Sequence, residues 1–190
     1  GNDSEVKQDR IIPQFGRSQG YRNFALVMAF PPLTIPSWLQ QHLLLSELTP
    51  DSPSTELDSV RLGLSRFSSD APAVSIVIPA FNEGKNIPAM LSSLSKLTLP
   101  DHYRVELLVV DDASTDETPD WLKVLNVPFV RLDKNSSVRE ARKKGLKVCK
   151  GEIILQADAD SVYPPDWGHQ YVTCLNNPEI AMVYGGHSFL

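Results

Sequence analysis

Two aspartates, Asp158 and Asp160, stand two residues apart directly after a short apolar run. That run, residues 152–157, follows Gly151 and carries three consecutive aliphatic side chains, a pattern typical of a strand buried on both faces. If the chain stays extended beyond it, both carboxylates point to the same side. Paired carboxylates in that position suit a hard divalent cation that also holds phosphate oxygens. The alternative is a solvated acidic turn, since short motifs match by chance in many proteins.

Two further apolar runs also end in residues rich in oxygen and nitrogen atoms. Residues 74–78 lead into residues 79–83 (PAFNE), and residues 105–110 lead into residues 111–116 (DDASTD). The carboxyl ends of parallel strands lie at one edge of a sheet, where open α/β folds bind their ligands. We therefore expect these two loops and the paired aspartates to build one cleft.

Strands and helices alternate regularly from residue 74 onward. The apolar runs predict strands over residues 74–78, 105–110, 127–132, 152–157 and 180–184. Helices are predicted over residues 84–96 after a cap at Asn82, around Trp121 after a cap at Asp116, and over 136–148 and 165–175. This alternation implies right-handed crossovers and a mostly parallel, Rossmann-like α/β sheet flanked by helices.

Residues 1–72 differ from the rest and hold seven of the fifteen prolines. A helix is expected from Pro36 and Ser37, with an apolar stripe that runs to Leu48 and packs on the main domain; a role at a partner or membrane surface is the alternative. Residues 49–72, rich in Ser, Asp and Pro, predict a linker with one turn of helix. We therefore divide the chain into an irregular N-terminal extension and linker, 1–72, and one α/β domain, 73–190.

The composition argues against several classes of function. A net charge of −5, with residues 142–144 (RKK) as the one small basic run, argues against a nucleic-acid partner. Cys149 and Cys174 lack metal-ligand spacing and form no disulfide framework, which favours a reducing, cytoplasmic compartment. The best membrane candidate, residues 24–45, is interrupted by prolines and polar residues and makes a poor spanning helix. No glycine-rich phosphate loop follows the first strand, which disfavours a dinucleotide or P-loop site.

Three segments, in this order and spacing, resemble the family 2 glycosyltransferases of the GT-A fold: VSIVIPAFNE, LLVVDDASTDET and REARKKGLKVCKGEIILQADADS. The resemblance covers about residues 73–185. It implies a metal-dependent enzyme that transfers a sugar from a UDP- or GDP-linked donor to a polysaccharide, lipid or other glycan acceptor. In this family the loop after the first strand lies along the base and ribose, which here gives Pro79, Ala80, Phe81 and Glu83.

The acid that closes the second strand bonds the base in this family, and Asp112 stands at that position. A carboxylate accepts from the imide N–H of uracil or from the N–H groups of guanine, so it does not choose between them. Its neighbour Asp111 is expected to brace the loop. Asp116 is expected to cap a helix rather than to bind a ligand.

Arg142 matches a family arginine in the helix before the metal motif. It either faces the donor diphosphate or holds the acidic loops by ion pairs; the remaining alternative is a solvated helix charge. Lys143 departs from the asparagine that many relatives carry at the next position. Asp158 and Asp160 match the DXD metal motif, whose second acid contacts the cation while the first usually touches ribose or metal-bound water. The resemblance thus implies Mn²⁺ or Mg²⁺, with diphosphate oxygens and water completing the shell.

Residues 161–190 hold only two acids, Asp166 and Glu179, and both fit cap or loop positions. Inverting members of the family use a general base well downstream of the metal motif. We therefore expect the catalytic base to lie outside this chain, the donor-binding portion of a longer enzyme that associates with the cytoplasmic face of a membrane. Two other classes stay open: a non-catalytic nucleotide-sugar-binding or scaffold domain, and a nucleotidyltransferase, which the lack of a Gly-rich, basic loop at residues 79–83 disfavours.

Overall fold

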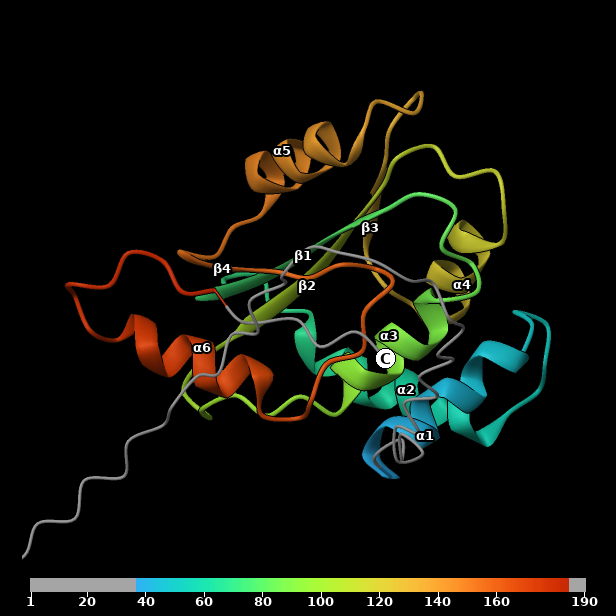
Figure 1. The fold of residues 1–190 in the computed structure, drawn as a ribbon, viewed down its shortest axis with the longest axis horizontal. Coiled ribbons are helices and arrows are strands. Elements are labelled where there is room, and N and C mark those ends of the chain that lie inside the picture. The colour runs from blue at the N-terminus through green and yellow to red at the C-terminus, as the bar shows by residue number, and fades with distance from the viewer. Residues whose placement is uncertain (1–36, 185–190) are drawn as a thin grey trace, which may run out of the picture. The chain divides into compact units, whose positions relative to one another are not determined.

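Four parallel strands form one sheet in the order β3-β2-β1-β4. The structure is a computed structural model and describes residues 37–184 (Figure 1). The strands are β1 (Val74–Ala80), β2 (Val105–Asp111), β3 (Phe129–Arg131) and β4 (Ile153–Gln156). Val74 of β1 lies opposite Val105 on one side and Ile153 on the other. The predicted mostly parallel α/β sheet is confirmed.

Helices cover both faces of this sheet. On one face lies α5 (Val138–Val148), and on the other lies α3 (Ile87–Ser95), as Figure 1 shows. The other helices that follow strands are α4 (Thr118–Val124), which connects β2 to β3, and α6 (Trp167–Leu175), which comes after β4. Strand alternation sorts the buried side chains, because successive residues point to opposite faces. Ile76 and Ile78 join the main apolar core, whereas Val77 points to α5.

The α5 helix packs closely on the sheet through a glycine. A Cβ atom added at Gly145 would overlap Cγ1 of Val77 and would lie 3.2 Å from Cγ2 of Val110. Ala141, one turn earlier, is fully buried. Small residues at these two positions let the helix backbone approach β1 and β2, which fixes where the polar side chains of α5 lie over the sheet.

Two helices precede the sheet and share its main core. The first, α1 (Ser37–Leu43), continues into a 3₁₀ turn at Leu44–Glu47, and the second, α2 (Thr55–Leu64), continues into one at Ser65–Phe67. Four apolar residues from the second helix and its turn are buried against the core. They are Leu57, Val60, Leu64 and Phe67. The prediction of a linker over residues 49–72 is therefore wrong in this region, because a regular apolar stripe anchors α2.

The expected packing of the first helix on the main domain is confirmed for the part that is described. Leu39 and Leu45 are buried, and Nδ1 of buried His42 lies 2.8 Å from the Ser92 hydroxyl of α3. Burial, and then repulsion from Lys96, lowers the pKa of His42, which keeps the imidazole neutral. Pro36 and the rest of residues 1–36, including most of the stretch 24–45, lie outside the described residues. The domain boundary between residues 72 and 73 stays a prediction.

Three local predictions are wrong. Residues 180–184 form no strand, and Met182 and Tyr184 are largely exposed. The side chains of β4 are not buried on both faces, since Ile153 and Ile154 are half-buried and Gln156 is exposed. Asn82 does not cap a helix, because α3 begins only at Ile87 and Asn82 has a left-handed backbone (φ 56°), whereas a cap residue is normally extended.

Candidate functional site

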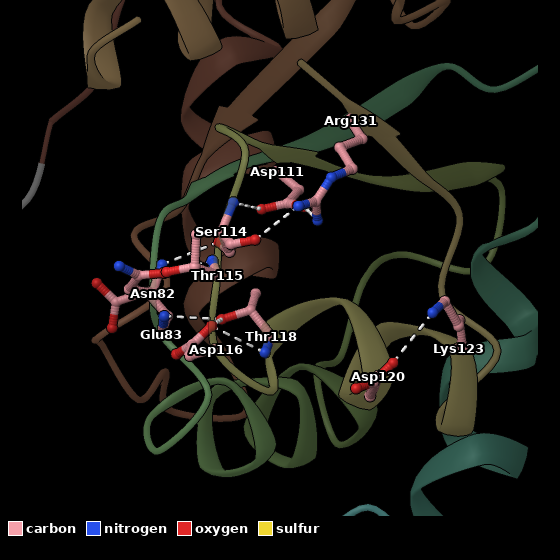
Figure 2. Close-up of polar contacts among 10 residues, drawn as sticks. All are labelled: Asn82, Glu83, Asp111, Ser114, Thr115, Asp116, Thr118, Asp120, Lys123 and Arg131. Carbon is pink, nitrogen blue, oxygen red and sulfur yellow. Dashed lines mark hydrogen bonds and ion pairs between the residues drawn. The ribbon is translucent and has the colours of Figure 1, made fainter. Parts of the chain in front are cut away.

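The loops after β1 and β2 are joined by a ladder of hydrogen bonds (Figure 2). The N–H of Asn82 donates to the Ser114 hydroxyl (2.9 Å), and the Asn82 side-chain oxygen accepts from the N–H of Thr115 (2.8 Å). The next two N–H groups, of Glu83 and Gly84, donate to Thr118 Oγ1 and Asp116 Oδ2, each at 2.8 Å. This ladder explains the left-handed conformation of Asn82, and it makes the two predicted loops one rigid unit.

Asp111 braces the loop, as expected from its position. Its carboxylate is fully buried, accepts from the N–H of Ser114 (3.0 Å) and pairs with the guanidinium of Arg131 at the end of β3. Arg131 also donates to the Ser114 carbonyl (2.6 Å), so it closes the loop from the other side (Figure 2). Arg131 is not among the residues predicted from the sequence, where only its place at the end of the third strand indicates this role.

Asp116 serves both loops with one carboxylate. Oδ1 accepts from the N–H (3.0 Å) and hydroxyl (2.6 Å) of Thr118, the first residue of α4. The helix-capping role expected of Asp116 is thus present, although Glu117 lies between it and the helix. Burial acts to raise the pKa of the Asp116 carboxyl, but hydrogen bonds from Thr118 and Gly84 outweigh burial and lower that pKa.

Asp112 connects the end of β2 to the loop before α5. It is 2% exposed, and its two oxygens accept from the N–H groups of Ser136 (2.8 Å) and Ser137 (2.9 Å). Ser137 has a φ of 105°, which the two bonds hold in place although a side chain is strained there. Each carboxylate oxygen keeps a further lone pair with which it can accept from a nucleotide base. That contact stays a prediction.

Arg142 and Asp158 form an ion pair between α5 and the end of β4. Nη2 of Arg142 lies 2.6 Å from Oδ1 of Asp158, and both side chains are about two-fifths exposed. Of the alternatives open for Arg142, the structure contains the ion pair to an acidic loop. Its Nε atom is buried and lacks a hydrogen-bond partner, so the guanidinium keeps unused donor capacity.

The two aspartates do not lie on one extended strand. β4 ends at Gln156 and residues 159–160 form a turn, so the expectation that strand alternation points both carboxylates the same way is wrong. The Tyr163 hydroxyl fixes the turn by accepting from the Asp158 N–H (2.6 Å). Burial, and further the negative charge of Asp158, raises the pKa of Tyr163 to about 12. Tyr163 is likewise not among the residues predicted from the sequence.

Asp160 is the most available carboxylate at this edge. It is exposed, and its one side-chain hydrogen bond is a long one, 3.4 Å, from the Ser161 hydroxyl. Among residues 37–184, no three His, Cys, Asp or Glu side chains are grouped to hold a metal ion. Asp158 and Asp160 offer two oxygen-bearing groups, which fit a hard cation when a second molecule supplies the other oxygens.

The predicted donor loop divides into buried and exposed parts. Pro79 and Ala80 belong to β1 and are buried. The backbone N–H and C=O groups of Val77 and the backbone of Pro79 face β4 rather than β2. Since the pairing of β1 with β4 ends at Val77, the N–H that Pro79 lacks would have had no partner in the sheet. Phe81 is 42% exposed. Half-buried Glu83 accepts from the Asn86 side chain (2.7 Å).

A family model described as Glycosyl transferase family 2 matches residues 75–188, and the chain belongs to this family. A Pseudomonas savastanoi protein named undecaprenyl-phosphate 4-deoxy-4-formamido-L-arabinose transferase is 33% identical over 99 residues, 49% of this chain and 29% of that protein. The glycosyltransferase AglE of Haloferax volcanii is 28% identical over 128 residues, 65% of this chain and 42% of AglE. The chain thus spans well under half the length of these relatives.

Solved structures with a similar fold include TarS from S. aureus in complex with UDP-GlcNAc. TarS is 33% identical, with a TM-score of 0.44 over 48% of this chain and 28% of TarS. A mannosyltransferase from Pyrobaculum calidifontis, solved with GDP-Man and Mn²⁺, is 22% identical, with a TM-score of 0.46 over 66% of this chain and 40% of that one.

Proposed function

We propose that this chain is the donor-binding part of a glycosyltransferase that moves a sugar from a nucleoside diphosphate to a glycan or lipid acceptor. Membership of family 2 supports the reaction class. The observation that carries the proposal is the Arg142–Asp158 ion pair beside the exposed Asp160, at the carboxyl end of β4. A guanidinium beside two carboxylates suits an anionic ligand, such as a diphosphate, that binds together with a metal cation.

In this proposal, Phe81, Asp112 and Arg142 each contact a different part of the donor. Phe81 offers a ring on which a base can stack, and the bracing of its loop by Asn82 and Asp111 keeps that ring in place. Asp112 holds the loop before α5 and accepts from the base with its free lone pairs. Arg142 turns from Asp158 toward the diphosphate. There it stabilises the negative charge that builds up on the diphosphate as the bond between sugar and diphosphate breaks.

Asp158 and Asp160 would hold a divalent cation, Mn²⁺ or Mg²⁺, together with diphosphate oxygens. Such a cation supplies positive charge to the leaving diphosphate. Without it, the two carboxylates would repel both each other and the donor. Before the donor binds, Arg142 compensates the charge of Asp158 alone, because its ion pair is to that residue.

Only the names of the relatives support a choice of acceptor. Several Pseudomonas relatives carry undecaprenyl-phosphate in their names, which supports a lipid acceptor for the whole protein. No helix within residues 37–184 is long and apolar enough to cross a membrane. We place the site at the cytoplasmic face of a membrane, in line with the two unpaired cysteines.

Calorimetric titration of UDP, GDP and uridine tests donor binding directly. Arg142→Gln removes the cation expected to meet the diphosphate, so the affinity for UDP or GDP should fall about tenfold while uridine binding stays within twofold. Arg139→Gln is the matched control, because Arg139 lies on the same helix with its side chain 87% exposed. Equal losses in both variants, or no binding of either diphosphate to the parent chain, would reject the proposal.

A further inference from the structure

We propose that the outer surface of α5 docks on an anionic membrane surface. We call this surface, with the lysines that flank the helix, the basic face; it consists of Arg139, Lys143, Lys144 and Lys147 on α5, Lys134 before the helix and Lys150 after it. The inference does not depend on the proposed function, since it rests on the charge and exposure of these residues and not on the candidate site.

Charge is distributed very unevenly along this chain. Residues 134–150 hold seven basic residues and one acidic residue, a net charge of +6, although the whole chain has −5. The other residues together therefore carry −11. In the sequence, only residues 142–144 form a continuous basic run. An acidic protein with one strongly basic face is oriented by its own field when it approaches a negatively charged surface.

The fold gathers this charge on one exposed side. Figure 1 shows α5 alone on its side of the sheet in the described part of the chain. Ala141 and Gly145 face inward, which leaves Lys143 and Lys147 exposed one turn apart. Lys134, Lys143, Lys144 and Lys147 also line an open hollow of about 370 Å³, shared with Asp133 and Glu140.

Most of these cations are not neutralised within the described residues. Glu140 lies 3.6 Å from Lys143 and 3.9 Å from Arg139, so one carboxylate serves two cations. Lys134, Lys144, Lys147 and Lys150 form no ion pair with any residue of the range 37–184. Four lysines thus keep their full charge for an external partner.

An apolar side chain on the outward side of the same helix favours a membrane over a nucleic acid. Leu146, which is 43% exposed, lies between Lys143 and Lys147 on that side. Val138 and Val148 are also partly exposed, but they follow the spacing of Ala141 and Gly145 and belong to the inward side. Cations with an aliphatic group between them are typical of helices that lie at a lipid interface, where the apolar group enters the headgroup boundary.

Docking through α5 would also place the candidate site close to the membrane. The loop before α5 is bonded to Asp112, and Arg142 in its middle is bonded to Asp158. Both contacts fix the helix relative to the sheet edge, so a helix that rests on the bilayer holds that edge near the surface.

Co-sedimentation of the whole 190-residue chain with vesicles tests the proposal. Mixed phosphatidylcholine and phosphatidylglycerol vesicles should bind it, and pure phosphatidylcholine vesicles should not. Binding should weaken steeply with added salt, since the screening length falls from about 10 Å at 0.1 M to about 3 Å at 1 M. The combined variant Lys134→Gln, Lys147→Gln and Lys150→Gln should bind about 100-fold more weakly, at about fivefold for each lysine.

Three exposed lysines elsewhere provide a control with the same charge change. They are Lys85, Lys96 and Lys123, and their combined replacement by Gln should lower vesicle binding less than fivefold. A second variant, Leu146→Ser, should weaken binding to mixed vesicles but not to heparin, which has no apolar phase. Equal effects of the two lysine sets, or binding of duplex DNA but not of mixed vesicles, would overturn the proposal; the second result would favour a nucleic-acid partner.

Discussion

Five aspartates near one sheet edge have different uses, which their hydrogen bonds distinguish. Asp111, Asp112 and Asp116 accept mainly from backbone N–H groups or from side chains of the neighbouring loops. Asp158 pairs with Arg142, and Asp160 is nearly free. An acid whose oxygens are engaged by the chain itself stabilises the site, whereas an acid left open to solvent is available to a ligand.

Asp116→Asn should weaken the connection between the loops after β1 and β2. An amide cannot accept from all the donors of Thr118 and Gly84 at once, so the unfolding free energy should fall by about 1 kcal/mol at pH 7, after allowance for solvent exposure. The pKa of this carboxyl is lowered by folding, so its contribution is complete above the usual value of 3.8 and disappears as the pH falls through the lower folded value.

Urea denaturation of the wild type and Asp116→Asn at pH 7 and at a series of values below pH 4 measures this effect. The difference between the two proteins should shrink as the pH falls. A difference that stays constant over this range would show that the Asp116 carboxylate does not carry the stabilisation.

At the scale of elements, the close contact of α5 with the sheet depends on Gly145. Ala is the better helix former by about 1 kcal/mol, yet Gly145→Ala should destabilise the protein by about 1–3 kcal/mol, because its methyl group would overlap the buried Val77. Exposed Lys147→Ala on the same helix should change the free energy of unfolding by less than about 0.5 kcal/mol.

A double variant makes the cause of this effect measurable. In a Val77→Ala background the space for the new methyl group exists, so adding Gly145→Ala should cost nothing or stabilise the protein. A loss of the same size in both backgrounds would show that the steric contact with Val77 is not the reason for the glycine.

The strands at the site edge were predictable because their apolar runs are continuous. Residues 74–78, 105–110 and 152–157 correspond to β1, β2 and β4. The α2 helix was missed because prolines and serines surround it, although Leu57, Val60, Leu64 and Phe67 repeat at helical spacing and would have revealed it. The predicted strand at 180–184 has an apolar sequence but no neighbour among the described strands, and a strand forms only by pairing.

The site itself was predictable in its residues but not in its contacts. The strand ends identify Asp111, Asp112 and Asp158 as acids at one sheet edge, and the family resemblance distinguishes Asp112 among them. Arg131 lies 20 residues from Asp111, and only the pairing of β2 with β3 brings the two together. Tyr163 lies five residues from Asp158, and their contact depends on the turn at residues 159–160 rather than on a periodic pattern.

At the scale of the whole molecule, the helices before the sheet belong to its core. Removing residues 1–70 would delete α1 and α2 and expose the face of α3 that they cover. Each fully buried Leu or Phe contributes about 1.5–3 kcal/mol, so losing four such residues approaches the total stability of a typical domain, about 5–15 kcal/mol. We expect residues 71–190 alone to lose cooperative unfolding.

Thermal unfolding followed by near-ultraviolet circular dichroism would compare this deletion with a chain that starts at Thr34 and keeps both helices. The chain from Thr34 should unfold in one cooperative transition. If residues 71–190 give a transition of equal sharpness, the α/β domain is independent and the boundary at residue 73 is correct.

In the proposed function, Asp158 and Asp160 bind a divalent cation together with a nucleoside diphosphate. Two carboxylates leave most of an octahedral shell to the ligand and water, so Mn²⁺ should bind weakly alone and more tightly with UDP or GDP. The enhancement should have the same size when the order of addition is reversed, because the coupling is reciprocal. Asp160→Asn should abolish it, Asp158→Asn should reduce it less, and Asp101→Asn, an exposed acid in a remote turn, should preserve it.

Calorimetric titration of UDP and GDP into the wild type and these three variants, with and without Mn²⁺, is the most direct measurement. We expect at least about tenfold tighter binding of one diphosphate with Mn²⁺ in the wild type and Asp101→Asn, and none of this gain in Asp160→Asn. Equal affinity with and without Mn²⁺ in the wild type would contradict this expectation, and residues 158–160 would then be a solvated acidic turn.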